Sequence, residues 1–114
     1  MELRSKTFLF EEETRWEAVN ENVKRQIMAY DEQLMVVKVH FATGGIGDPH
    51  RHPHTQSTFV ASGVFEFTVE GETQIIRTGD CVYIHPEALH GCQCLEAGIL
   101  IDTFSPARRD FLSE

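Results

Sequence analysis

Residues 64–70 read Val-Phe-Glu-Phe-Thr-Val-Glu, and this alternation of apolar and polar side chains decides the fold class. A period of two is the period of a β-strand, so Phe65, Phe67 and Val69 should face a core while the residues between them face solvent. The turn at Glu70-Gly71-Glu72 ends the stretch, and residues 73–78 return as a second strand. The stretch therefore predicts one arm of a hairpin in a half-buried sheet.

The same spacing of strands and turns extends to both sides of this hairpin. Gly63 is interpreted as a sharp reversal, and residues 43–49 and 86–90 as loops. Residues 1–22 are expected to form a polar lead-in that packs on the barrel through Trp16, and residues 23–114 one β domain with a C-terminal tail. Short strands at this spacing are typical of an all-β sandwich or barrel. The further strands are expected at residues 24–30, 34–41, 57–62, 81–84, 91–95 and 99–104.

The composition excludes several classes of partner. The 114 residues carry 10 Lys and Arg against 18 Asp and Glu, a formal net charge of −8, whereas duplex nucleic acid requires clusters of basic residues. No apolar run reaches the roughly 20 residues of a membrane span. Three glutamates at 11–13 stand where a signal peptide would need its apolar core. We expect a cytoplasmic protein that binds neither nucleic acid nor membrane, with Cys81, Cys92 and Cys94 as reduced, half-buried thiols.

The histidines form the strongest chemical signal in the chain. His50 and His52 lie two residues apart, so on an extended segment their side chains leave the same face and can bind one ion. Gln56 keeps the same parity and offers a carbonyl oxygen, and His90 must arrive from another strand. We predict that His50, His52, Gln56 and His90 bind one divalent metal ion, with zinc, nickel, manganese, iron and cobalt all compatible with these ligands. His54 shares the parity and is placed at the pocket rim, with a role as ligand as the alternative.

Two motifs resemble those of the cupin family. The pattern Gly47-x-x-His50-x-His52-x-x-x-Gln56, closed by a glycine at position 63, resembles the first cupin motif. The pattern from Gly79-Asp80 to Pro86-x-x-x-His90 resembles the second, although Gln56 replaces the usual carboxylate and the inner glycine of the Pro-x-Gly element is absent. The resemblance implies a single cupin-type double-stranded β-helix, a jelly-roll barrel with a metal ion in its mouth.

A narrower resemblance covers roughly residues 16–112. Together with residues 23–27, 34–39 and 50–56, the closing stretch Ile101-Asp102-Thr103-Phe104-Ser105-Pro106-x-Arg108-x-Asp110-Phe111-Leu112 resembles the small pectin-degradation cupins of the KdgF type. Thr55 stands where many of these proteins have Glu. The resemblance implies a redox-neutral enzyme that opens 4,5-unsaturated uronates from pectin or alginate to the linear keto acid, with a small sugar acid as its partner.

The last predicted strand supplies the candidate catalytic residues. Leu100, Asp102 and Phe104 share one face of that strand. The resemblance makes Asp102 the general acid and base, and partial burial would raise its pKa toward the working range. Arg108 could hold a substrate carboxylate through a bidentate fork, and Phe104 could form an apolar wall. The residues alone leave open a surface role for Asp102 and Arg108 and plain core packing for Phe104.

The sequence is also compatible with two other functions, and it predicts an assembly state. A metal-dependent cupin oxygenase is one alternative, since similar sites bind iron and activate oxygen. A non-catalytic sugar-binding cupin is the other. The cupin resemblance implies a homodimer with twofold symmetry, because a cupin-like sheet of this size often pairs through an edge strand.

Overall fold

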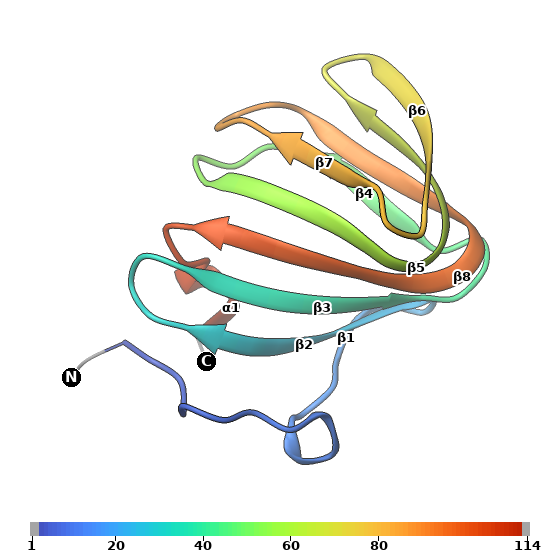
Figure 1. The fold of residues 1–114 in the computed structure, drawn as a ribbon. Helices are drawn as coiled ribbons and strands as arrows, with labels where there is room; N and C mark the ends of the chain where they lie inside the picture. Colours follow the sequence, from blue (N-terminus) through green and yellow to red (C-terminus); the bar gives the residue numbers. More distant parts are fainter. Residues whose placement is uncertain (1–2, 113–114) are drawn as a thin grey trace.

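Strands make up most of the regular structure in the computed structural model, which describes residues 3–112 (Figure 1). The sheet is antiparallel with the order β1-β2-β3-β8-β5-β6, and β4 pairs with β8 while β7 pairs with β5. The elements in chain order are the 3₁₀-helix η1 (Glu11–Glu13), β1 (Glu17–Asn20), β2 (Val23–Tyr30), β3 (Met35–Phe41), β4 (Ile46–His50), β5 (Thr55–Val69), β6 (Glu72–Arg77), β7 (Cys81–Ile84), β8 (His90–Ser105) and α1 (Arg109–Leu112). The expected jelly-roll barrel is confirmed.

Two long strands build the barrel. β5 and β8 pair from Thr55 opposite Ser105 to Val69 opposite His90, with register shifts between Val60 and Phe65. Figure 1 shows the two strands bending together at one end of the molecule, so that their halves lie in different layers. The bend places β4 and β6 across from β2 and β3, and the enclosed space becomes the interior of the barrel.

Glycines make the bend possible, and here the sequence interpretation was wrong. Gly63 does not reverse the chain but lies inside the continuous strand β5, with a φ of 93°. A Cβ atom on Gly98 of β8 would stand 2.1 Å from the carbonyl oxygen of Ser62, so only glycine permits this close approach. The strands expected separately at 57–62 and 64–70, and at 91–95 and 99–104, are therefore two bent strands rather than four.

The core confirms the alternation of residues 64–70. Phe65 and Phe67 are buried, Glu66 is exposed and Val69 is half-buried. The Phe65 ring meets the Phe41 ring edge to face, with 5.2 Å between the centroids. The buried apolar set on the other strands includes Met35, Val37, Val39, Val60, Ile84 and Leu100.

The N-terminal segment contributes one strand and lies along β2. Residues 17–20 form β1 and pair with β2, and Gln26 of β2 donates hydrogen bonds from its amide to the carbonyl oxygens of Glu11 and Thr14. The Trp16 ring meets the His40 ring at 4.6 Å between centroids. The loop expected at 43–49 was partly wrong, since residues 46–50 form β4 against β8.

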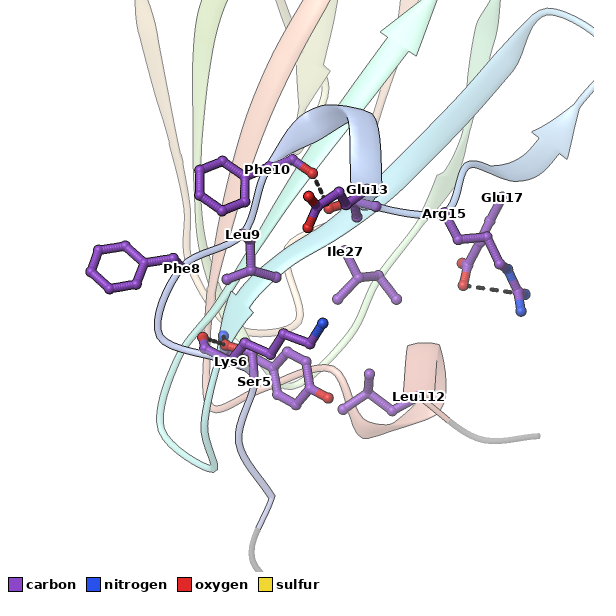
Figure 2. A pocket seen from close by; sticks show the side chains of 12 residues that line it. Ser5, Lys6, Phe8, Leu9, Phe10, Glu13, Arg15, Glu17, Ile27 and Leu112 are labelled. Atoms are coloured by element: carbon purple, nitrogen blue, oxygen red, sulfur yellow. Dashed lines mark hydrogen bonds and ion pairs between the residues drawn. The ribbon is translucent and has the colours of Figure 1, made fainter.

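A surface cavity of about 360 Å³ lies between the N-terminal segment, β2 and Leu112 (Figure 2). Its lining mixes apolar side chains such as Leu9 and Ile27 with charged ones, and the Phe8 and Phe10 rings point away from Ile27 (Figure 2). No helix within residues 3–112 is long and apolar enough to cross a membrane. All three cysteines are free thiols, but only Cys92 is half-buried as expected, because Cys81 is exposed and Cys94 is buried.

Candidate metal centre

Strand register brings the distant histidine to the clustered ones. His50 at the end of β4 pairs with His90 at the start of β8, and His52 follows two residues after β4. Gln56 is the second residue of β5, and its side chain points into the barrel because alternate residues of that strand are buried. Three strand ends and one connecting loop therefore supply the four predicted ligands.

His50, His52 and His90 form a cluster that can hold a metal ion. One ring nitrogen from each residue lies within 4.8 Å of the others. The ring centroids of His50 and His90 are 4.4 Å apart, and those of His52 and His90 are 5.0 Å apart. His52 and His90 are buried, while His50 stands at the exposed edge of the cluster. His54 lies outside this group, although its ring centroid is 5.2 Å from that of His52.

Hydrogen bonds to the backbone orient two of the rings for coordination. Nδ1 of His50 lies 2.9 Å from the carbonyl oxygen of Asp48, and Nδ1 of His90 lies 2.9 Å from that of Ala88. Since a carbonyl oxygen only accepts, both rings carry their proton on Nδ1 and present the lone pair of Nε2. Nε2 of His90 is buried and has no hydrogen-bond partner within residues 3–112, as expected of an atom that serves as a metal ligand.

Gln56 completes the candidate ligand set. Its Oε1 lies 2.8 Å from Nε2 of His52. Two ligand atoms at right angles about one ion, each about 2.1 Å from it, would be roughly 3 Å apart, so this pair fits a shared ion. His52, Gln56 and the two oriented histidines therefore fit a divalent cation without any carboxylate ligand.

Burial keeps His52 and His90 neutral. Burial lowers the pKa of His90 to about 4, with a smaller opposing contribution from its hydrogen bond to Ala88. Burial also lowers the pKa of His52, against the hydrogen bond to Gln56. Both imidazoles are thus in the neutral form at physiological pH, which is the form that binds a metal.

The cluster opens into a cavity of about 360 Å³ inside the barrel. Asp102 lies on its wall beside Gln56 and His90, as the face shared by Leu100, Asp102 and Phe104 predicts. Burial raises the pKa of Asp102 to about 6, while the hydrogen bond from Thr58 and the charge of Arg108 oppose that rise. The apolar part of the wall comes from Val37, Val39, Phe41, Phe67, Leu100 and Phe104.

Arg108 lies beside Phe104 at the cavity wall, but part of its fork is already engaged. Its Nε and Nη2 donate to the two carboxylate oxygens of Asp110, at 3.1 and 2.9 Å. Its guanidinium carbon lies 4.2 Å from the centroid of the Phe111 ring and 5.1 Å from that of Phe104. A substrate carboxylate would bind the remaining N–H donors or replace Asp110.

Phe104 lies where it can serve both as part of the core and as an apolar wall of the cavity, the two roles that the sequence suggests. The side chain is buried, its ring centroid lies 5.7 Å from that of His52, and it also lines the cavity. Core packing and a wall beside the histidines are therefore compatible at this residue.

The sequence interpretation missed two contributors to the site. Thr58 bridges Gln56 and Asp102 through its hydroxyl group. Phe111 of the C-terminal tail contacts Arg108 and also Arg25, whose guanidinium carbon lies 3.8 Å from the ring centroid. Thr58 could have been found from the sequence, because it lies two residues after Gln56 and so points to the same face of the strand. Phe111 could not, because its position depends on how the C-terminal tail folds back.

Comparison with known proteins agrees with this architecture. The family model of the cupin domain matches residues 37–101. The pectin degradation protein KdgF of Dickeya dadantii (strain 3937) is 47% identical over 107 residues, which cover 92% of this chain and 97% of that protein.

Two solved structures also match over nearly their full length. An RmlC-like cupin from Shewanella frigidimarina NCIMB 400 has a TM-score of 0.93 and 40% identity, covering 96% of this chain and 98% of that one. KdgF from Halomonas sp. has a TM-score of 0.89 and 36% identity, covering 94% and 99%. The chain belongs to the cupin family, and within it to the KdgF proteins.

Proposed function

We propose that this protein is a metal-dependent enzyme that converts 4,5-unsaturated uronates from pectin or alginate breakdown into the linear keto acid. The observation that supports it most is that Asp102 lines the same cavity as His50 and His90, two members of the three-histidine cluster. The similarity to a pectin degradation protein adds the class of substrate.

The metal would be held by His50, His52, Gln56 and His90. All four ligands are neutral, so a divalent ion bound there would keep its full charge and act as a Lewis acid toward substrate oxygen. That local charge matters because the net charge of −8 on the chain disfavours an anionic substrate at long range.

The conversion is an isomerisation, so no oxidant, reductant or net water is needed. The bond between C1 and the ring oxygen breaks as the C1 hydroxyl loses its proton and the ring oxygen gains one, which leaves an aldehyde at C1 and an enol at C5. Loss of the enol O–H proton and addition of a proton at C4 then give the ketone at C5, with no net change in protons. Asp102 would deliver this proton from its acid form, since a carboxyl group with a pKa of about 6 is partly protonated near neutral pH.

Arg108 and Phe104 would position the sugar acid. The N–H groups of Arg108 would bind the substrate carboxylate, with the guanidinium group held in place by the Phe111 ring. Phe104 would present its ring face to the sugar beside the histidine cluster.

Steady-state kinetics on unsaturated galacturonate test the proposal. Loss of the absorbance of the double bond should accompany formation of the keto acid, and Asp102→Asn should lower turnover by ~10²–10⁴-fold, the usual contribution of a positioned acid or base. Metal content should not change, because Asp102 is not a ligand in this scheme. Full activity of the variant would remove Asp102 from the mechanism, and an inactive wild-type protein would favour the oxygenase or the sugar-binding module.

We also propose a cytoplasmic homodimer. The sheet leaves β1 and β6 at the two ends of its strand order, and Val19 of β1 and Ile75 of β6 are exposed apolar side chains at those edges. Analytical ultracentrifugation tests the assembly: a single species of monomer mass at high concentration would contradict it.

A further inference from the structure

We propose that Thr58 is a positioning residue for both halves of the site: it fixes the Gln56 amide with its oxygen toward the histidines and holds the Asp102 carboxyl group in place. This inference rests on the proposed metal site and deepens it. A buried chain of contacts runs from His52 through Gln56 and Thr58 to Asp102: Gln56 donates to Thr58 and Thr58 donates to Asp102, while Gln56 Oε1 and His52 Nε2 lie 2.8 Å apart and can face one ion.

Strand register creates this connection. Thr58 of β5 lies directly opposite Asp102 of β8, and Gln56 lies opposite Phe104. Gln56 and Thr58 are two residues apart and both point into the barrel. The Thr58 residue is fully buried, so solvent does not compete for its hydroxyl group.

The direction of each hydrogen bond follows from the chemistry of the groups. The Thr58 hydroxyl group has one hydrogen, and it donates this hydrogen to Oδ1 of Asp102 at 2.7 Å. Toward Gln56 the hydroxyl oxygen can therefore only accept, and it does so from the amide Nε2 at 2.9 Å. The amide group is planar, so its Oε1 must point the other way, to Nε2 of His52 at 2.8 Å.

Without the hydroxyl group, both neighbours lose a partner in a buried setting. The Gln56 amide would lose the acceptor that its Nε2 contacts at 2.9 Å, and with it part of what keeps its oxygen toward the histidines. Asp102 would lose the donor that contacts Oδ1 at 2.7 Å and would keep only the weaker contribution of the Gln56 side chain from the opposite strand. Residues that orient metal ligands in this way typically change metal affinity or activity by about 10–100-fold when they are replaced.

Isosteric substitution with a matched control tests the proposal. Thr58→Val keeps the shape and removes the hydroxyl group, whereas Thr58→Ser keeps the hydroxyl group. Val60→Ala is the control, because Val60 is buried two residues further along the same strand and face but does not line the cavity. Zinc affinity is measured on chelator-stripped protein by competition with a chromophoric chelator, together with the thermal melt.

We expect Thr58→Val to weaken zinc binding by about 10–100-fold, Thr58→Ser to bind close to wild-type affinity, and Val60→Ala to lose stability while keeping its zinc affinity. Equal zinc affinity of Thr58→Val and wild type would overturn the proposal. So would an equal loss in Thr58→Val and Thr58→Ser, because that would point to packing rather than the hydroxyl group.

The unmodified protein gives a test that does not depend on folding of a variant. In nuclear magnetic resonance spectra, a Gln56 amide proton should show a nuclear Overhauser contact to the Thr58 side chain. Absence of that contact in the assigned spectrum would mean that the amide has the opposite orientation, and the proposal would be wrong.

Kinetics separate this inference from the proposed function. With saturating zinc, Thr58→Val should lower kcat on unsaturated galacturonate more than it changes KM, because Thr58 holds the proton-transfer group and does not contact the substrate. An unchanged kcat at full zinc occupancy would refute the role toward Asp102. If wild-type protein does not act on any uronate, the proposed function fails, and the zinc and resonance measurements still decide the role toward Gln56.

Discussion

Replacing Asp102 by Asn should make the metal-free protein more stable above pH 6, while it removes activity. Asp102 is a carboxyl group whose burial raises its pKa from 3.8 to about 6. The folded protein therefore binds its proton more tightly than the unfolded chain does. Well below pH 3.8 the group is neutral in both states and costs nothing, and as pH rises from 3.8 to about 6 the fold loses stability because the charged form is disfavoured.

The size of the effect follows from the shift in pKa. A shift of about two units corresponds to ~3 kcal/mol at about 1.4 kcal/mol per unit. The side chain keeps some of its surface open to the cavity, so we expect Asp102→Asn to gain ~1–3 kcal/mol at pH 8 and well under about 1 kcal/mol at pH 4. Asn keeps an oxygen that accepts the hydrogen bond from Thr58, so the neutral side chain fits the same position.

Urea denaturation of chelator-treated wild type and variant over pH 4–8 measures this difference directly. The difference in the free energy of unfolding should appear between pH 4 and 6 and remain constant above that range. Glu66→Gln is the matched control, because it makes the same change from acid to amide on the exposed outer face of β5, away from the cavity. A variant less stable than wild type at pH 8 would show that the charged Asp102 stabilises the fold, and the reasoning from burial would be refuted.

Three further perturbations test the fold and the site. Phe67→Ala should cost about 3–5 kcal/mol in urea melts, since the ring is buried in the barrel; a loss below about 1 kcal/mol would mean that the ring contributes little to the core. Arg108→Lys should raise KM for unsaturated galacturonate more than it lowers kcat, because a point charge replaces a fork, and an unchanged KM would remove Arg108 from substrate binding. The double variant His50→Ala/His90→Ala should contain no bound metal by elemental analysis, and wild-type metal content would rule out the site.

Local periodicity made the strands and the ligand parity predictable from the sequence. The alternation around Phe65 and Phe67 identifies the buried face, because the period of two depends only on the conformation of one strand. For the same reason, the spacing of His50 and His52 predicts that their side chains leave the same face. Gly63 was misread because a glycine with positive φ serves a bulge in a continuous strand as well as it serves a reversal, and only the partner strand distinguishes the two.

Contacts between distant strands could not be predicted in this way. Thr58 and Asp102 are 44 residues apart in the chain, and their hydrogen bond depends on the register between β5 and β8. The ion pair between Arg108 and Asp110 is local, but its position against the Phe111 ring depends on how the tail turns after β8. Sequence resemblance suggested roles for Asp102 and Arg108, whereas the raised pKa of Asp102 and the occupied fork of Arg108 are properties of the packed structure.

Turnover as a function of metal occupancy tests the central claim most directly. Chelator-stripped wild-type protein is titrated with a divalent metal ion, and the initial rate of loss of unsaturated galacturonate is measured at each addition. The initial rate should be zero without metal, rise linearly with added ion and reach a plateau at one ion per chain, because His50, His52, Gln56 and His90 form one site. Turnover by the stripped protein at the rate of the loaded protein would contradict it.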